Sequence, residues 1–368
     1  MPESLYIGLM SGTSTDGVDA VLADLTDLSR PQIRAQASLP MPEALRREFL
    51  ALNIAGPDEL RRAALAGNAL ARLYAQAVQD LLEQAQLQPS DIVAIGAHGQ
   101  TVRHDPAAGY TIQINAPALL AELSQIDVIA DFRSRDIAAG GQGAPLVPAF
   151  HQSIFRCAHP RTVLNLGGIA NVTLLNPAKE VRGFDTGPAN VLLDLWCQQK
   201  TGQAYDEDGR WAASGTPHPQ LLAALIADEP WFALPPPKST GRDLFNWAWL
   251  QQRLLPFADQ KLPDNDVQAT LQSLTARTVA DAIHTQAPET RDVLVCGGGA
   301  LNTALMRDLE HYLQRPVMPT SKLNVEVQLV EALAFAWLAW AHVNRHPAGL
   351  PAVTGASAAR VLGCKYPS

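Results

Sequence analysis

The sequence predicts an α/β protein with two lobes, each a mixed sheet flanked by helices. Its 368 residues correspond to two domains at about 150 residues per domain. Both halves of the chain open with the same pattern: a strand, a glycine-containing turn, two more strands and then a helix. With 47% hydrophobic residues and with 25 Gly and 27 Pro dispersed along the chain, the composition is that of an ordered globular protein with many turns.

The first half combines short apolar runs with one long helical pattern. Its expected strands cover residues 5–10, 18–25, 33–39, 92–97, 111–114 and 127–130. Its expected helices cover residues 58–84, after the start signal Pro57-Asp58, and 116–123. The three opening strands predict an antiparallel meander.

The second half follows a glycine-rich link at residues 138–144 and a helix at 147–155. Its expected strands cover residues 162–166, 169–175, 181–184 and 293–296. Its expected helices cover residues 189–200, 267–286, 300–313 and 327–343. The proline-rich residues 230–240 predict an irregular loop.

Charge and cysteine content exclude several classes of protein. Lys and Arg number 28 against 36 Asp and Glu, a net charge of −8, which argues against nucleic acid as the main partner. The four cysteines are far apart, so no zinc or redox pair is predicted, and such thiols suit a reducing cytoplasm. The N-terminus has no signal-peptide pattern, and the apolar residues 333–341 are too few to cross a bilayer. We expect a cytoplasmic protein without a membrane partner, whose apolar late helix allows a homodimer.

Three glycine turns at strand ends are candidates for phosphate binding. In residues 11–17, small residues and hydroxyls would offer donors to an anion, and Asp16 and Asp19 could hold a Mg²⁺-bound water. An ordinary Asp-Gly hairpin explains this turn equally well. Gly167 and Gly168 would supply a second such hairpin.

The third glycine turn, residues 297–299, lies between a strand and a helix, whose N-terminus would favour an anion. A tight strand–helix connection is the plainer explanation, although three glycines exceed what it requires. Together the three turns suggest a nucleotide in a cleft between two lobes, as in the actin-like and sugar-kinase architecture.

One carboxylate stands at the end of a second-half strand. Asp185 ends the strand at 181–184, and the next helix is expected to begin near Pro188. The acid could cap this helix, or it could be the general base of a phosphoryl transfer, which needs positioning, electrostatics and one such base. Its position alone favours neither.

Polar side chains after a buried strand suggest a pocket for hydroxyls. His98, Gln100 and Thr101 follow the strand at 92–97 and offer both donors and acceptors. Arg133 and Arg135 could bind a carboxylate bidentately, or could belong to a surface ion-pair cluster.

Two further charged features have a functional and a structural interpretation. Residues 238–242, Lys-Ser-Thr-Gly-Arg, are typical of a mobile anion-binding or lid loop. Glu331 interrupts an apolar helix, where a carboxylate is costly unless it is paired or functional.

These segments together resemble the anhydro-N-acetylmuramic acid kinase family over nearly the whole chain. The order and number of the matching stretches make the resemblance specific. They are GLMSGTSTDGVDAVLADL, IGAHGQTVRH, ADFRSRDIAAGGQGAPLVPAFH, LNLGGIANVTLL, GFDTGPANVLLD, PPPKSTGRDLFNW, VCGGGALN, VEALAFAWLA and VTGAS.

The resemblance implies the sugar kinase, Hsp70 and actin fold with a ribonuclease H-like core. It places residues 1–130 and 353–368 in an N-terminal lobe and residues 131–352 in a C-terminal lobe. It implies ATP-dependent conversion of 1,6-anhydro-N-acetylmuramic acid, with water opening the anhydro bridge, to N-acetylmuramic acid 6-phosphate and ADP in peptidoglycan recycling.

The resemblance also implies roles for particular residues. Asp185 matches the catalytic base that activates water. Mg²⁺ would accompany the nucleotide. Candidate ATP contacts are Gly12, Thr13, Ser14, Thr15, Asp16, Gly17, Val18, Asp19, Gly167, Gly168, Gly297, Gly298, Gly299 and Asn302. Candidate sugar contacts are His98, Gln100, Thr101, Arg133 and Glu331. Residues 322–330 depart from the family pattern, which usually has a glycine and acidic residues before Glu331.

Two other classes of protein compete with a kinase. A non-catalytic or chaperone-like ATP-binding protein would share the fold, because a fold does not determine function. The chain lacks a recognisable peptide-binding domain after the second lobe, which counts against a chaperone. A nicotinamide oxidoreductase is excluded, because the glycine turn at 297–299 lies late and no matching acidic position follows.

Overall fold

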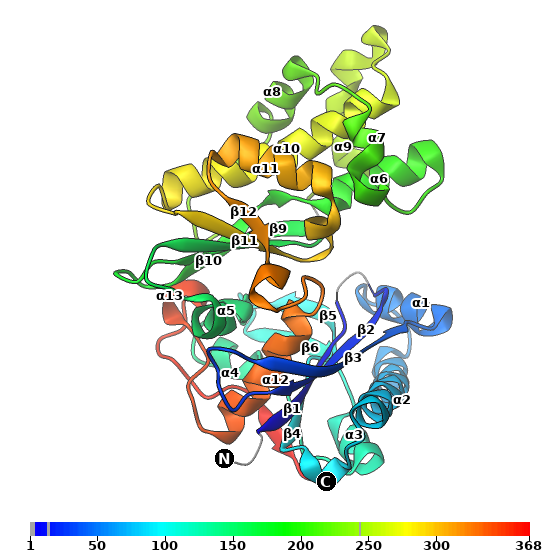
Figure 1. The fold of residues 1–368 in the computed structure, drawn as a ribbon. Coiled ribbons are helices and arrows are strands. Elements are labelled where there is room, and N and C mark those ends of the chain that lie inside the picture. Colours follow the sequence, from blue (N-terminus) through cyan, green and yellow to red (C-terminus); the bar gives the residue numbers. More distant parts are fainter. Residues whose placement is uncertain (1–3, 13–14, 243) are drawn as a thin grey trace. The chain divides into compact units, whose positions relative to one another are not determined.

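The chain forms two compact units in a computed structural model that describes residues 4–12, 15–242 and 244–368. Unit 1 comprises Met1–Phe155 and Leu329–Ser368, and unit 2 comprises Arg156–Gln328 (Figure 1). The chain therefore leaves unit 1 after its first 155 residues and returns to it for the last 40.

Unit 1 is built on a six-stranded mixed sheet with the order β13-β7-β4-β1-β2-β3. The strands are β1 (Leu5–Met10), β2 (Gly17–Asp24), β3 (Gln32–Pro40), β4 (Ala94–Ala97), β7 (Val128–Ala130) and β13 (Cys364–Tyr366). Strands β1, β2 and β3 form the predicted antiparallel meander, and β4 and β7 continue the sheet in parallel to β1. Strand β13, from the end of the chain, pairs antiparallel with β7.

Helices cover both faces of this sheet. They are α1 (Glu43–Leu52), α2 (Glu59–Ala85), α3 (Pro117–Ser124), α4 (Ser134–Ile137), α5 (Val147–Phe155), α12 (Val330–Val343) and α13 (Pro351–Thr354), with a 3-10 turn at Pro89–Asp91. Side chains alternate along a strand. Leu5, Ile7 and Leu9 of β1 join the core under α1 and α2, whereas Gly8 faces α12.

Helix α12 packs directly onto the central strands. A Cβ atom at Gly8 would overlap the carbonyl oxygen of Ala332, and one at Gly96 would overlap that of Phe335. The helix is apolar on nearly all sides because it is buried against the sheet, as expected for a helix without a polar face. The apolar surface of this helix, from which the sequence allowed a homodimer, is therefore buried within unit 1.

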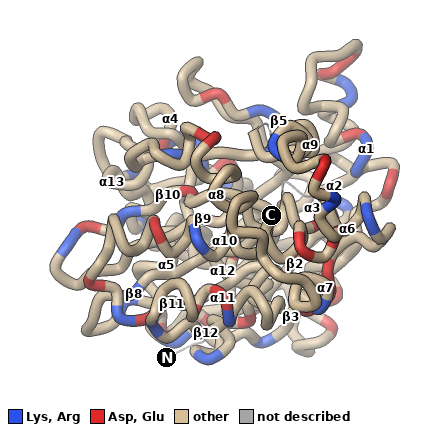
Figure 2. The backbone as a smooth tube through the Cα atoms, turned by 90° about the horizontal axis from the view of Figure 1, so that it is seen from above, with Lys and Arg blue, Asp and Glu red and all other residues tan. Residues whose placement is uncertain are grey.

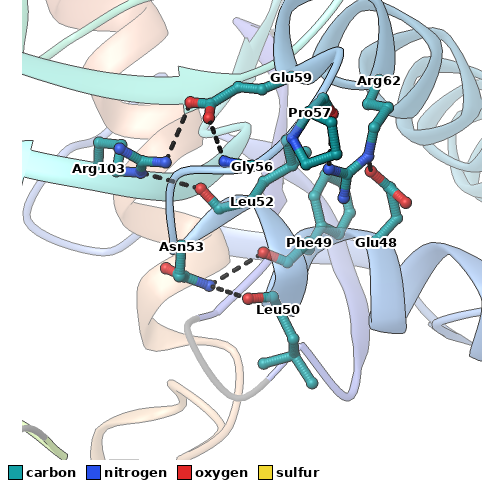
Figure 3. Close-up of polar contacts among 10 residues, drawn as sticks. All are labelled: Glu48, Phe49, Leu50, Leu52, Asn53, Gly56, Pro57, Glu59, Arg62 and Arg103. Carbon is teal, nitrogen blue, oxygen red and sulfur yellow. Dashed lines mark hydrogen bonds and ion pairs between the residues drawn. The ribbon is translucent and has the colours of Figure 1, made fainter.

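A two-stranded hairpin, β5 (Gln100–Asp105) and β6 (Tyr110–Ile114), lies beside the main sheet. Arg103 fixes it to the α1–α2 connection: its Nε donates to the carbonyl of Leu52 at 2.9 Å and its Nη2 to Glu59 at 3.0 Å (Figure 3). Glu59 also accepts from the amide of Gly56 at 2.8 Å. One carboxylate thus joins the hairpin to the start of α2.

Unit 2 is built on a five-stranded mixed sheet with the order β10-β9-β8-β11-β12. The strands are β8 (Arg161–Leu166), β9 (Ile169–Leu175), β10 (Arg182–Pro188), β11 (Asp292–Cys296) and β12 (Val317–Pro319). Helices α10 (Asp264–Gln286) and α11 (Thr303–Leu313) pack on the sheet and complete one core.

A second, tryptophan-rich core of unit 2 lies among its remaining helices. These are α6 (Asn190–Thr201), α7 (Arg210–Ala213), α8 (Pro219–Ala227) and α9 (Trp247–Leu254). The 3-10 turns of this unit are η2 (Glu207–Gly209), η3 (Pro230–Ala233), η4 (Leu255–Gln260), η5 (Gly298–Leu301) and η6 (Thr320–Leu323).

The two sheets share one strand order, which confirms the predicted repeat. In unit 1 the order across the first five strands is β3-β2-β1-β4-β7, and in unit 2 it is β10-β9-β8-β11-β12. When the strands of each unit are numbered in chain order, both sheets have the order third, second, first, fourth, fifth. In both, the first three strands are antiparallel and the fourth and fifth run parallel to the first. This is the ribonuclease H-like arrangement, so the α/β class with mixed sheets flanked by helices is confirmed.

The unit boundaries differ from the predicted ones at residues 130 and 353. Residues 131–155 and 329–352 belong to unit 1, because α5 packs on α12 and α12 packs on β1 and β4. Pro188 closes β10 instead of opening a helix, and α11 begins at Thr303, after η5. Short elements of mixed polarity, among them α1, β5, α9 and β13, were not predicted.

The distribution of charged and apolar residues over the described structure can be compared with what the composition predicted. Basic and acidic residues are intermixed along the backbone of both units (Figure 2). No helix within the described ranges is both long and apolar enough to cross a membrane. The same ranges contain no group of three or more His, Cys, Asp or Glu side chains arranged to hold a metal ion.

Candidate active site

The predicted phosphate turn joins β1 to β2 in unit 1. The carbonyl of Gly12 accepts from the amide of Thr15 at 3.0 Å, which closes a tight turn, and from Nε2 of Gln100 at 3.1 Å. The hydroxyl of the buried Ser11 donates to Oε1 of Gln100. Thr13 and Ser14, two of the predicted ATP contacts, lie outside the described residues. Gln100 therefore braces the base of the turn through both ends of its amide.

The far end of this turn leads into the sheet. The Val18 side chain is fully buried in the core, so only its backbone could reach a ligand. Gly17 pairs with β3, where a Cβ would press on the carbonyl of Leu39. Asp16 is exposed, and Asp19 is half-buried and accepts from the Ser38 hydroxyl at 2.6 Å. Both carboxylates remain candidates for water-mediated metal contacts.

His98 connects the turn to Arg133. Its Nδ1 lies 3.1 Å from the carbonyl oxygen of Ser11, so this nitrogen carries the hydrogen and donates. Its Nε2 lies 3.0 Å from Nη2 of Arg133 and accepts. Burial, aided by the charge of Arg133, lowers the pKa of His98 to about 3. His98 therefore stays neutral and orients its neighbours instead of exchanging protons.

Arg133 is half-buried, and its guanidinium has donors that no described residue uses. Its Nη1 donates to the carbonyl of Gly143 at 2.9 Å, and its Nη2 donates to His98. Its buried Nε has no hydrogen-bond partner among the described atoms. Burial lowers the pKa of Arg133, and the nearby carboxylate of Glu331 raises it. A guanidinium with an unused N–H suits an anionic ligand.

Glu331 lies in the first turn of α12, near Arg133 and Asp19. Burial raises the pKa of its carboxyl, Arg133 lowers it, and Asp19 raises it. The structure thus brings Glu331 together with Arg133, whereas Arg135 is exposed on α4. Thr101 is half-buried on β5 and its hydroxyl accepts from Nε2 of Gln113 at 3.2 Å.

The predicted base, Asp185, lies on β10 of unit 2 at a bulge between Asp185 and Gly187. Its Oδ2 accepts from the amide of Thr240 at 2.9 Å, and its own amide donates to the carbonyl of Lys238 at 3.1 Å. Burial raises the pKa of Asp185 to about 6, against the Thr240 hydrogen bond and the charge of Lys238. Such a carboxyl is ionised near neutral pH yet basic enough to take a proton.

Lys238, in the segment predicted to be a mobile anion-binding or lid loop, anchors the residues that hold Asp185. Its Nζ donates to the carbonyls of Trp231 at 3.3 Å and Phe232 at 2.9 Å, and lies 4.3 Å from the centre of the Trp231 ring. The indole N–H of Trp231 donates in turn to the carbonyl of Ser239 at 3.0 Å. Two of the three N–H donors of this ammonium are therefore used in contacts within unit 2.

The two glycine turns of unit 2 lie against each other. A Cβ at Gly297, where φ is +81°, would come within 2.7 Å of the Leu166 carbonyl oxygen. A Cβ at Gly299 would come within 2.6 Å of the Leu166 Cβ. At Gly298 the nearest atom to such a Cβ would be Nδ2 of Asn190, at 3.9 Å. Only the middle glycine therefore faces open space.

The hairpin turn at Gly167 and Gly168 caps α6. The carbonyl of Gly167 accepts from the amide of Asn190 at 3.0 Å, and that of Gly168 accepts from Val191 at 3.1 Å. Asn302 has a similar structural role: its Oδ1 accepts from the amide of Leu305 at 2.9 Å and caps α11. The side chain of Asn302, a predicted ATP contact, is thus committed to the helix.

Sequence reasoning included Ser11 and Thr240 in candidate segments without giving either an individual role, and it did not single out Tyr74. Tyr74 of α2 accepts at its hydroxyl from the amide of Gly99 at 3.2 Å and supports the segment after His98. Thr240 acts through its backbone, which no side-chain pattern marks. Ser11 was part of a recognised turn, but its pairing with a residue 89 positions away has no local signal.

Two ribonuclease H-like units in one chain, one with a polar hairpin turn and the other with an acid on its third strand, are an arrangement typical of actin-like ATPases and sugar kinases. A family model for anhydro-N-acetylmuramic acid kinase matches residues 4–368. The chain is 67% identical to the anhydro-N-acetylmuramic acid kinase of Bordetella pertussis over 100% of its length and 97% of that protein. It is 53% identical to the Chromobacterium violaceum protein of the same name, over 99% of each. The chain belongs to the anhydro-N-acetylmuramic acid kinase family and is a kinase of that sugar.

The solved structures to which the chain is similar are more distant. One is the activator of the 2-hydroxyisocaproyl-CoA dehydratase from Clostridium difficile, at 13% identity and a TM-score of 0.47 over 92% of this chain and 96% of that one. Another is a ROK family glucokinase from Streptomyces griseus, at 15% identity and a TM-score of 0.41 over 91% and 99%.

Proposed function

We propose that this kinase uses ATP, accompanied by Mg²⁺, to convert 1,6-anhydro-N-acetylmuramic acid and water into N-acetylmuramic acid 6-phosphate and ADP. The observation that carries the proposal is Asp185, a half-buried carboxyl whose pKa of about 6 suits a general base near neutral pH. The conformation of its carboxyl group is fixed by the amide of Thr240.

Asp185 would remove a proton from a water molecule as the water oxygen forms a bond to C1 of the sugar. The bond between C1 and O6 breaks, and the electron pair stays on O6. O6 then forms a bond to the γ-phosphorus of ATP, and the bond from that phosphorus to the leaving oxygen of ADP breaks. The proton taken up by Asp185 is released to solvent after turnover, so the reaction balances.

The residues of unit 1 would bind the substrates. The free Nε–H of Arg133 suits the carboxylate of the muramic acid side chain, and His98, Gln100, Thr101 and Glu331 suit its hydroxyl and amide groups. Backbone amides of the turn from Gly12 to Asp19 would hold phosphate. The glycine turns of unit 2 at 167–168 and 297–299, with the backbone of Asn302, are the proposed second set of nucleotide contacts.

Asp16 and Asp19 are carboxylates at the end of the proposed phosphate turn, a donor set that suits Mg²⁺ contacts through water. When bound, the ion would neutralise charge on the phosphate oxygens. We further propose that the reaction serves peptidoglycan recycling in the cytoplasm, consistent with four cysteines that form no disulfide.

Isotope labelling tests the water step. The enzyme is incubated with ATP and the anhydro sugar in ¹⁸O-labelled water, and the product is analysed by mass spectrometry. We expect one ¹⁸O atom at C1 and none in the phosphate ester. Label absent from C1 would contradict attack by water at that carbon.

Asp185→Asn tests the base. Because general base catalysis contributes about 10²–10⁴ in rate, kcat should fall by at least that factor while the protein stays folded. Asp281→Asn is the matched control, because Asp281 is a surface carboxylate of unit 2 paired with Arg277. Near-normal turnover by Asp185→Asn would remove Asp185 from the mechanism.

A further inference from the structure

Asp185 is positioned by a loop that itself needs an anchor. The two backbone hydrogen bonds to Asp185 come from Lys238 and Thr240, two positions apart on residues 230–240. This loop contains four prolines and no regular structure beyond η3. Its regular backbone hydrogen bonds are therefore few, and side-chain contacts must define its conformation.

The ammonium of Lys238 provides those contacts. Its hydrogen bonds to the carbonyls of Trp231 and Phe232 close a loop of seven residues, and the Trp231 ring lies beneath the charge. The indole N–H of Trp231 holds the carbonyl of Ser239, between the two residues that bind Asp185. One lysine and one tryptophan thus fix both hydrogen bonds to the carboxylate-bearing residue.

We infer that Lys238 is a positioning residue for the reaction: its ammonium holds the segment 238–240 against η3, and this segment holds Asp185. The inference rests on the proposed role of Asp185. It assigns to Lys238 a function that needs no contact with either substrate.

The effect of Lys238 on the pKa of Asp185 can be distinguished from the effects of other charged groups nearby. Lys238 is the cation that favours the ionised form of Asp185, and the residue opposite Asp185 on β9 is the uncharged Asn171. Two other carboxylates, Glu229 and Asp281, line a pocket of about 580 Å³ beside Lys238. Each is already paired with an arginine, Arg253 and Arg277.

Lys238→Met should remove two influences that keep the pKa of Asp185 near 6, namely the positive charge and the anchored Thr240 amide. We expect that pKa to rise by about one unit. At pH 6 the ionised fraction would then fall from ~50% to ~9%, which by itself lowers kcat/KM about 5-fold, whereas at pH 8 the change in ionisation by itself lowers it under about 1.2-fold. A larger loss at pH 8 would measure displacement of the carboxylate. Lys238→Arg should behave as wild type, because a guanidinium can bind carbonyls and stack on Trp231.

Lys200→Met is the matched control. Lys200 also lies over a tryptophan of unit 2, with Nζ 4.6 Å from the Trp196 ring, and pairs with Asp264 on the surface. This variant should keep the wild-type pH profile. Lys238→Gln is the second test variant, to be used if Lys238→Met does not fold. It loses the charge but keeps an N–H donor, and it should also shift the pH profile of kcat/KM upward.

A direct titration separates this inference from the proposed function. The carboxyl ¹³C signal of Asp185 is followed against pH in protein labelled with [4-¹³C]aspartate, and Asp185→Asn assigns the signal. An upward shift in Lys238→Met but not in Lys200→Met supports the positioning role even if Asp185 proves not to be the base. An Asp185 titration that is unchanged in Lys238→Met would overturn it.

Discussion

At the scale of single residues, the burial that makes Asp185 basic should also make it destabilising. Its folded-state pKa of about 6 lies above the value of about 3.9 for an unfolded aspartate. The folded protein therefore binds this proton more tightly, so the cost is absent below about pH 4, grows between pH 4 and 6, and is complete above pH 6.

Asp185→Asn should accordingly stabilise the protein while abolishing activity. The side-chain amide can still accept from Thr240, and it removes a buried charge. We expect a gain of about 1–3 kcal/mol in unfolding free energy at pH 8 and little gain at pH 4. Urea denaturation at the two pH values measures this, and an equal effect at both would contradict the linkage.

Arg133 and Arg135 are neighbours that should differ sharply in function. Arg133 is half-buried with a free Nε–H, whereas Arg135 is exposed. Arg133→Lys removes the forked geometry, so KM for the anhydro sugar should rise about 10-fold or more while KM for ATP changes little. Arg135→Lys should match wild type. Similar sugar KM values for both variants would remove Arg133 from the sugar site.

At the scale of secondary structure, the accuracy of sequence reasoning depended on hydrophobic pattern. The strand at Leu5–Met10, the strand at Ile169–Leu175 and the helix at Val147–Phe155 were predicted to the residue, because each is a clear apolar segment. Strand β5, with the sequence QTVRHD, was missed because its stability comes from Arg103 and from pairing with β6.

The site was predictable to the extent that its residues follow strands. His98 was found in this way, directly after β4, and so was Asp185, although β10 continues beyond the predicted strand to Pro188 and leaves Asp185 in its middle. The anchoring of Lys238 on Trp231 was not predicted. Its acceptors are backbone carbonyls, which no side-chain pattern marks, and the sequence of the loop suggests an exposed segment. The sequence pattern showed that Glu331 needed a partner, and only the fold identified Arg133.

The close packing of α12 on the sheet of unit 1 can be tested by substitution. Gly96→Ala would drive a methyl group into the backbone of Phe335, which cannot move without displacing the helix. We expect a loss of about 3 kcal/mol or more in stability. Gly56→Ala is the control, because its new methyl would meet only the end of the Arg62 side chain at 3.3 Å. Thermal denaturation compares the two, and equal melting temperatures would contradict the tight contact.

At the scale of the whole molecule, the discontinuity of unit 1 has a consequence for folding. Unit 2 is a continuous segment with two cores of its own, whereas the central sheet of unit 1 is covered on one face by α12, from the end of the chain. Without α12, the glycine-lined face of β1 and β4 has no helix to pack against, and β13 is also missing.

Separate expression of the segments tests this dependence. Residues 156–328 should fold alone, with cooperative thermal unfolding, because their cores contain no residue from elsewhere in the chain. Residues 1–155 should lack cooperative unfolding, and a fusion of 1–155 to 329–368 through a flexible linker should restore it. Cooperative unfolding by 1–155 alone would mean that α12 is dispensable to the sheet. The contacts of Gly8 and Gly96 with the α12 backbone would then form on a sheet that is already stable without the helix.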